Sequence, residues 1–302
     1  MIEDPQGTID YQVSGTGPTV VLVPGSCSTG AAWRPVTASW DGRFRCVTTS
    51  LLGYGGTVER RKPDDPAMAF EAEAVELVLR KAGGSVHLVG HSFGGLVALA
   101  VALRNEVPLA SLTIIEAPAA ELLRGCGEDN LYNAFRRMTD AYVVDFASGN
   151  LNAIAAMIDF YGGRGTFDSW PLKLRAYVAE TTTVNILDWA TAYGLPITAS
   201  ALAQLELPVL VIRGGESHPA VQRANELLAE HIQDARLATI ESATHFMIAT
   251  HFEEVARLVA EHIYSVPNEH QRWSPFFGQA VKLGSPDEKD GPDDGQAEAV
   301  WS

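Results

Sequence analysis

Hydrophobic and polar positions alternate along the chain with two different periods. Short apolar runs rich in β-branched residues are typical of strands buried on both faces, and they occur at 8–15, 19–25, 43–52, 85–90, 109–118, 207–215 and 235–242. Stretches with helical periodicity lie between them, at 67–81, 93–104, 220–232 and 252–264. The first two strands are joined by a Gly-Thr-Gly-Pro turn and are expected to form a hairpin. The repetition of strand and helix predicts an α/β fold with a mostly parallel sheet flanked by helices.

One interval lacks any strand pattern. Between 119 and 205 the sequence shows only helical stretches, at 131–146, 151–161 and 172–190. We interpret this interval as a helical cap inserted between two strands of the sheet. The chain is therefore divided into a core (1–118 and 206–265), the cap (119–205) and an acidic tail (266–302) that is expected to be flexible.

Composition and charge narrow the classes of function. The chain of 302 residues is 46% hydrophobic and 20% charged, which is typical of a globular protein. Its net charge of −15 argues against a nucleic-acid partner, because binding phosphates needs clustered Lys and Arg. No apolar run approaches the roughly 20 residues needed to cross a bilayer, and the polar N-terminus is unlike a signal peptide. A cytoplasmic protein that binds no membrane is expected.

The segment "LVGHSFGGLVALA" (88–100) carries the strongest chemical signal. Ser92 lies between Gly90 and Gly94, at the point where a predicted strand turns into a predicted helix. Such a turn needs small neighbours and presents the serine hydroxyl at the tip of the sheet, so G-x-S-x-G in this context indicates a catalytic nucleophile. The alternative is a serine that only caps the helix. We predict that Ser92 is the nucleophile.

A serine hydroxyl needs an adjacent base, because it is almost never ionised at neutral pH. His245 lies in the loop between the last predicted strand and the last predicted helix, at the sheet edge where Ser92 is expected. Most of the other histidines lie on helices or in the tail, where a solvated or packed histidine is the usual interpretation. The sequence therefore predicts His245 as the base.

These motifs resemble those of the α/β-hydrolase family, from about residue 8 to residue 264. "VLVPGSCSTG" (21–30) is similar to the family's strand and oxyanion loop, with Pro24-Gly25 in place of the usual His-Gly. The resemblance implies an acyl-enzyme mechanism in which the backbone amides of Ser26 and Phe93 form the oxyanion hole. It calls for no cofactor and no metal, and the three cysteines (27, 46 and 126) have no metal-ligand spacing.

The acid of the triad is where the chain departs from the family's usual pattern. The family places an aspartate shortly after the strand at 207–215, where this chain has Ser217, with Glu216 adjacent. Glu116 instead ends the apolar strand at 109–118, and haloalkane dehalogenases and a zearalenone-type lactone hydrolase are similar in carrying their acid there. A buried carboxylate needs a partner, which His245 would supply. We predict Glu116 as the acid and keep Glu216 as the alternative.

Together these residues predict a serine hydrolase that cleaves an ester or lactone of a small, fairly apolar substrate. A serine at the elbow excludes the relatives that use an aspartate nucleophile. Two alternatives share the fold: a C–C bond hydrolase or cofactor-free oxidative enzyme with the same Ser and His, and a small-molecule receptor that turns its ligand over poorly. Aromatic residues of the cap favour an apolar cavity, although a cap packing its own core would also contain them.

Overall fold

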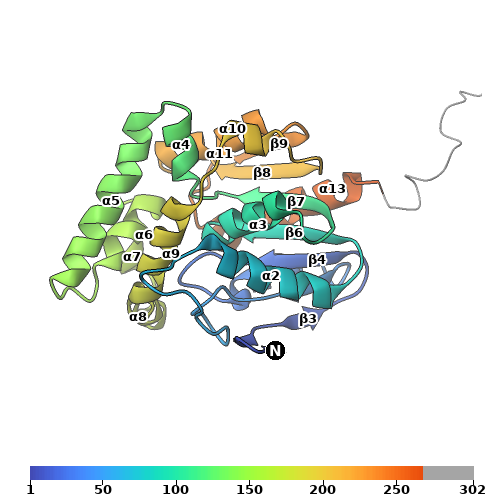
Figure 1. Ribbon diagram of the computed structural model, residues 1–302, viewed down its shortest axis with the longest axis horizontal. Coiled ribbons are helices and arrows are strands. Elements are labelled where there is room, and N and C mark those ends of the chain that lie inside the picture. The colour runs from blue at the N-terminus through green and yellow to red at the C-terminus, as the bar shows by residue number, and fades with distance from the viewer. Residues whose placement is uncertain (268–302) are drawn as a thin grey trace, which may run out of the picture. The chain divides into compact units, whose positions relative to one another are not determined.

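Seven strands form one sheet in the computed structural model, which describes residues 1–267. Their order across the sheet is β3-β5-β4-β6-β7-β8-β9 (Figure 1). The strands are β3 (Gln12–Ser14), β4 (Thr19–Val23), β5 (Arg45–Thr48), β6 (Val86–His91), β7 (Leu109–Ile115), β8 (Val209–Gly214) and β9 (Ala235–Ile240). Only β3 is antiparallel to its neighbour, and all other pairs are parallel. The expected α/β class with a mostly parallel sheet is confirmed.

The N-terminal strands differ from the expectation. The run at 8–15 is divided between two strands, and β1 (Ile2–Asp4) pairs with β2 (Gly7–Ile9) in a separate two-stranded sheet. β3 pairs with β5 and not with β4, with Val13 opposite Val47. The predicted hairpin is wrong, because both edges of β4 are occupied by parallel neighbours, β5 and β6. A turn signal between two strands does not decide their pairing when other strands compete for the same edge.

Helices cover both faces of the sheet (Figure 1). One face carries α2 (Met68–Ala82), α3 (Phe93–Arg104) and α11 (Pro219–His231). The other carries η1 (Gly30–Trp33), α1 (Arg34–Ser39), α12 (Met247–Thr250) and α13 (Phe252–Ser265). On this second face the indole Nε1 of Trp40 donates a hydrogen bond of 2.9 Å to the carbonyl of Ala256, which joins segments far apart in the sequence. The apolar side chains buried on each face form the two halves of the core.

The described stretch between β7 and β8 consists of helices joined by loops and contains no strand. It contains α4 (Ala120–Gly125), α5 (Asp129–Ala147), α6 (Ile154–Gly162), α7 (Thr166–Ser169), α8 (Leu172–Glu180), α9 (Thr182–Gly194) and α10 (Ala199–Leu202). We call residues 119–205 the helical insertion. The helix expected over 172–190 is interrupted at Thr181, whose hydroxyl donates to the carbonyl of Tyr177 at 3.0 Å. The backbone hydrogen bonds from Thr181 N to the Tyr177 carbonyl (3.1 Å) and from Asn185 N to the Thr181 carbonyl (3.0 Å) are kept, so α8 and α9 are joined by a local irregularity at this residue.

Within residues 1–267, none of the helices combines the length and the apolar character that a bilayer crossing requires. The expected flexible tail lies outside the described residues, apart from its first two positions.

Candidate active site

Ser92 lies at the turn between β6 and α3. Its backbone adopts φ 56° and ψ −128°, a conformation that costs energy for any residue with a side chain. The turn is held by the Ser92 amide, which donates to the carbonyl of Ile115 on β7 at 2.8 Å. The strained backbone of Ser92 is therefore held in place by a hydrogen bond to the neighbouring strand β7.

The glycines around Ser92 are required by close backbone approaches. A Cβ on Gly94 would lie 2.2 Å from the carbonyl oxygen of Pro24, and a Cβ on Gly90 would lie 2.3 Å from that of Gly94. No side chain fits at these distances. The two glycines thus allow the helix to begin directly against the strand and against the loop after β4.

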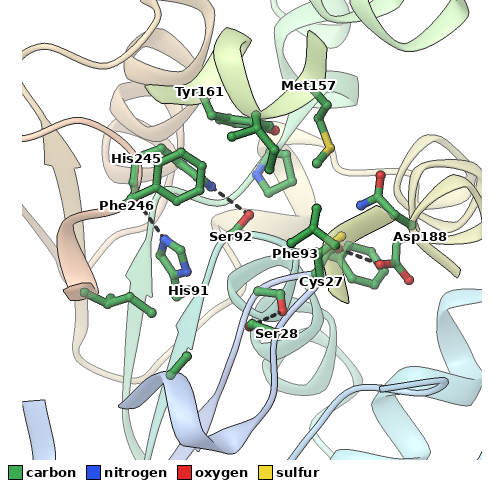
Figure 2. A pocket seen from close by; sticks show the side chains of 18 of the residues that line it. Cys27, Ser28, His91, Ser92, Phe93, Met157, Tyr161, Asp188, His245 and Phe246 are labelled. Atoms are coloured by element: carbon green, nitrogen blue, oxygen red, sulfur yellow. Dashed lines mark hydrogen bonds between the residues drawn. The ribbon is translucent and has the colours of Figure 1, made fainter. Parts of the chain in front are cut away.

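His245 follows β9 and precedes α12, in the loop that the sequence indicated. Its Nε2 lies 2.8 Å from the Ser92 Oγ, and the residue is 3% exposed. The ring of His91 lies below it and bonds through Nε2 to the His245 carbonyl at 2.9 Å (Figure 2). Since a carbonyl only accepts, His91 carries its proton on Nε2. His91, which directly precedes Ser92, thereby holds the backbone of the loop that carries His245.

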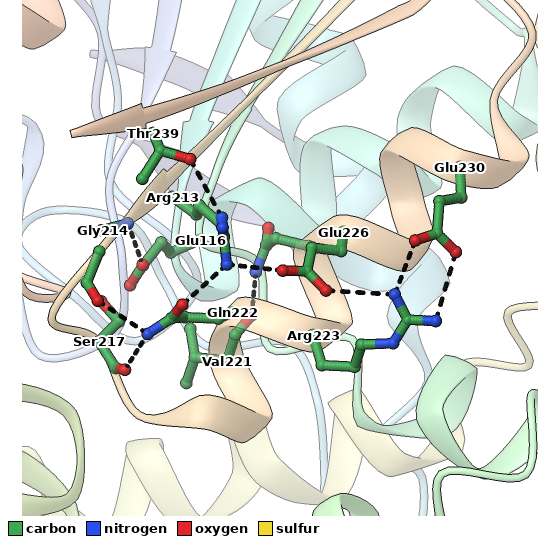
Figure 3. Close-up of polar contacts among 12 residues, drawn as sticks. Glu116, Arg213, Gly214, Ser217, Val221, Gln222, Arg223, Glu226, Glu230 and Thr239 are labelled. Atoms are coloured by element: carbon green, nitrogen blue, oxygen red, sulfur yellow. Dashed lines mark hydrogen bonds and ion pairs between the residues drawn. The ribbon is translucent and has the colours of Figure 1, made fainter. Parts of the chain in front are cut away.

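Glu116 directly follows β7 and is fully buried. Its Oε2 lies 2.8 Å from Nδ1 of His245, and its Oε1 accepts a hydrogen bond of 2.6 Å from the amide of Gly214 at the end of β8 (Figure 3). The backbone of Glu116 has φ 48°, in the left-handed region that non-glycine residues rarely adopt. Both carboxylate oxygens have partners, which offsets the cost of burying the charge.

The alternative acid lies elsewhere. Glu216 is exposed, and no hydrogen bond joins its carboxylate to another of the described residues. Its loop is anchored by Gln222, whose Nε2 donates to the carbonyls of Ser217 (2.7 Å) and Gly215 (3.0 Å; Figure 3). The hydroxyl of Ser217, at the position of the family's usual aspartate, is buried without a partner among residues 1–267. The structure thus brings Glu116, and not Glu216, to His245.

The two residues predicted to form the oxyanion hole both line the cavity beside Ser92. Phe93 is the first residue of α3, and Ser26 follows Gly25, where an added Cβ would lie 2.9 Å from the Ser92 Cβ. Neither amide has a hydrogen-bond partner among the described residues. Unpaired amides beside a nucleophile can donate hydrogen bonds to a developing oxyanion.

Ser92 and His245 open into a cavity of about 360 Å³, a size suited to a small organic molecule. Its other wall comes from the helical insertion and includes Met157, Tyr161 and Trp189. The Tyr161 ring stacks on the His245 imidazole with 4.1 Å between centroids, and Figure 2 shows it on the side of the ring opposite His91. The cavity is mostly apolar, which suits a substrate with an apolar body.

Sequence reasoning missed a buried ionic cluster at the cavity wall. Asp188 on α9 accepts hydrogen bonds of 2.6 Å from the hydroxyls of Ser26 and Tyr54, and its other oxygen lies 2.8 Å from the guanidinium of Arg61. Arg61 also pairs with Glu71 at 3.1 Å. Burial raises the pKa of Glu71 to about 8. The positive charge of Arg61 lowers that pKa by a smaller amount, because one guanidinium is shared among several carboxylates. The sequence carried one usable signal, an aspartate on the apolar side of a helix.

The remaining titratable groups at the site are not arranged as metal ligands. Among residues 1–267 no three His, Cys, Asp or Glu side chains form a group that could hold a metal ion. Burial and the neighbouring His245 lower the pKa of His91 to about 3, and burial raises the pKa of the Cys27 thiol to about 12. Both groups are therefore neutral at physiological pH.

Comparison with known proteins gives consistent matches. A model of the alpha/beta hydrolase family matches residues 20–258. Over 267 residues the chain is 25% identical to the pimeloyl-[acyl-carrier protein] methyl ester esterase of Aeromonas salmonicida, covering 83% of this chain and 98% of that protein. An esterase structure from Exiguobacterium antarcticum aligns with a TM-score of 0.68 at 17% identity (86% and 98% covered). A thermophilic esterase from Thermogutta terrifontis gives 0.67 at 22% identity (86% and 94% covered).

Proposed function

The chain belongs to the alpha/beta hydrolase family, and on this premise we propose that it hydrolyses carboxylic esters or lactones of small, neutral and largely apolar substrates. The observation that carries the proposal is the chain of two 2.8 Å contacts that links Ser92, His245 and Glu116 at the wall of an apolar cavity. The relative from Aeromonas salmonicida and the structural neighbours from Exiguobacterium antarcticum and Thermogutta terrifontis are all esterases, which supports an ester as the bond that is cleaved.

The first half of the proposed reaction forms an acyl-enzyme. The Ser92 Oγ attacks the carbonyl carbon of the substrate while His245 Nε2 takes the hydroxyl proton. Glu116 holds the Nδ1–H tautomer and stabilises the positive charge that develops on the imidazole. The Ser26 and Phe93 amides bind the oxyanion, and such donors contribute on the order of 3 kcal/mol each. His245 then gives the proton to the leaving alcohol oxygen as the bond to the acyl carbon breaks.

The second half regenerates the enzyme. Water attacks the acyl carbon and gives a proton to His245, and the second tetrahedral intermediate collapses to the free acid with return of the proton to Ser92. In this scheme the helical insertion acts as the cap over the sheet and shapes the substrate cavity. Tyr161 restricts the imidazole to the orientation between Ser92 and Glu116, since it covers one face of the ring.

Hydrolysis of p-nitrophenyl butanoate by the full chain tests the proposal. Ser92→Ala is expected to lower kcat by at least about 10³-fold, because the nucleophile is lost while the cavity remains. Ser28→Ala serves as a matched control at the same cavity, since its hydroxyl donates to the Gly25 carbonyl and makes no other hydrogen bond among residues 1–267. Circular dichroism checks that each variant is folded. Equal turnover by Ser92→Ala and wild type, or no turnover of any ester or lactone by wild type, would overturn the proposal and favour a receptor.

A further inference from the structure

Helix α9 presents one stripe of side chains to the cavity. Asn185, Asp188, Trp189 and Ala192 follow one another at the spacing of a single helical face, and all four line the cavity. The two polar members lie toward the beginning of the helix and the two apolar members toward its end. The insertion wall therefore has one polar patch, Asn185 and Asp188, within an apolar surface.

Asn185 is the unexplained member of this patch. The residue is 1% exposed, and its carboxamide makes no hydrogen bond to any described residue, although its backbone amide continues the helix through Thr181. Asn225 gives a direct contrast, because it is equally buried yet bonds to the backbone of Ala117 in both directions and to the carbonyl of Val221. Buried amides without a partner are costly and uncommon. One that lines a substrate cavity points to a partner on the ligand.

The surroundings define the charge of that partner. The Oδ2 of Asp188 accepts from the hydroxyls of Ser26 and Tyr54. Its Oδ1 forms no hydrogen bond among the described residues but lies 2.8 Å from the Arg61 guanidinium, so the charge of Asp188 is already paired. The guanidinium of Arg61 is shared with Glu59 and Glu71, so the cluster behind the patch carries no excess positive charge. An anionic group on the substrate would face carboxylates here. A neutral group that accepts or donates a hydrogen bond suits a carboxamide in this position.

We propose that Asn185 is a specificity-determining residue that hydrogen-bonds a neutral hydroxyl or carbonyl group of the substrate, away from the bond that is cleaved. This inference rests on the proposed function and names the substrate class within it: esters or lactones with an apolar body and one neutral polar group. A carboxylate in place of that group would be disfavoured.

Matched substrate pairs test the proposal in two arms. In the first, p-nitrophenyl esters from butanoate to octanoate are compared with the same esters carrying a terminal hydroxyl, a keto group or a carboxylate on the acyl chain. In the second, butanoate esters of simple alkanols are compared with those of the corresponding diols. At one chain length, wild-type kcat/KM is expected to favour the neutral polar substrate over the plain one by about tenfold, and the carboxylate substrate is expected to be poorest.

Variants then assign the preference to one side chain. Asn185→Leu, close to asparagine in shape, is expected to remove the tenfold preference, so that kcat/KM falls about tenfold more for the polar ester than for the plain ester. Asn185→Ser, which keeps a hydrogen-bonding group, is expected to retain part of the preference for the polar ester. Met157→Leu changes the apolar wall and should shift both members of a pair alike. Labelling of Ser92 by a fluorophosphonate confirms that each variant retains a folded site, and Asn185→Ala replaces the leucine variant if that one does not fold.

The outcomes separate the two proposals. If wild type hydrolyses neither member of any pair, the proposed function fails. If it hydrolyses both members equally in both arms, or if the preference persists in Asn185→Leu, only the assignment of Asn185 is overturned. Equal loss of activity on plain and polar substrates in Asn185→Leu would show a structural role and would also overturn it.

Discussion

The two walls of the cavity are built in different ways. The sheet wall includes Ser92 and His245, which follow β6 and β9, together with Ser26 in the loop after β4. Glu116, which follows β7, lies behind this wall. The strands place these residues at one edge of the sheet, and 2.8 Å contacts link Ser92 to His245 and His245 to Glu116. The insertion wall depends instead on how α6 and α9 dock on the sheet, and its Asn185 has no partner among residues 1–267.

This difference assigns separate roles to the two walls, chemistry to the sheet wall and substrate recognition to the insertion wall. The positions that would perform the chemistry are fixed by the sheet before any substrate binds, which is the preorganisation that catalysis requires. The wall that would recognise the substrate is attached through side chains and can change without disturbing the strands. Three experiments test this division, in order of decreasing expected effect.

The first experiment concerns the two glutamates that follow neighbouring strands, Glu116 after β7 and Glu216 after β8. Glu116→Gln is expected to lower kcat for an ester on the order of 10³- to 10⁴-fold, because His245 loses its tautomer control and its counter-charge. Glu216→Gln is the matched control and should change kcat only a few-fold, since its side chain is exposed. Steady-state kinetics with p-nitrophenyl butanoate gives both values. A reversed ranking of the two variants would assign the acid to the loop after β8.

The second concerns the contact between the walls. The hydrogen bond from Ser26 to Asp188 ties the predicted oxyanion loop to α9, so Ser26→Ala keeps the amide but frees the loop. We expect kcat to fall about tenfold with a smaller change in KM, because the amide acts mainly on the transition state. Ser28→Ala removes a serine hydroxyl from the same loop without touching α9. Equal losses in the two variants, or a change in KM alone for Ser26→Ala, would contradict a positioning role for this contact.

The third experiment concerns how His91, beside Ser92, affects the stability of the protein toward acid. The folded protein keeps His91 neutral, with its pKa lowered to about 3, whereas the unfolded chain takes up a proton below the ordinary value of 6.5. The unfolded state therefore binds more protons in this window, and the free energy of unfolding should fall as the pH drops from 6.5 toward 3, by up to about 1.4 kcal/mol per pH unit.

Urea unfolding at a series of pH values measures this contribution. His91→Gln keeps a donor for the His245 carbonyl but cannot titrate, so the difference between wild type and variant isolates the histidine. That difference should be constant above pH 6.5 and should change below it in favour of the variant. Parallel pH curves for the two proteins would show that His91 does not titrate in this window.

Much of the sheet wall could be predicted from local sequence. The apolar strand before Ser92, the glycines beside it and the apolar helix after it specify the strand–turn–helix unit without reference to the rest of the chain. His245 was found because a loop after a parallel strand must open at the same sheet edge. These inferences depend on short-range geometry, and the alternation of strands and helices gave the class of the fold in the same way.

Tertiary structure alone decided the questions that depend on long-range packing. The sequence placed Glu116 and Glu216 each after a strand, but only the docking of the β9 loop, more than a hundred residues from Glu116, determines which carboxylate reaches His245. The predicted N-terminal hairpin was wrong because β5 and β6 compete for both edges of β4. In the sequence Asn185 is indistinguishable from an ordinary polar helix residue, and its unpaired carboxamide becomes evident only once the insertion is placed over the sheet. The sequence determined most of the elements and the turn that holds Ser92, because backbone geometry near Ser92 is local, whereas the partners of the buried polar groups follow from packing between distant segments.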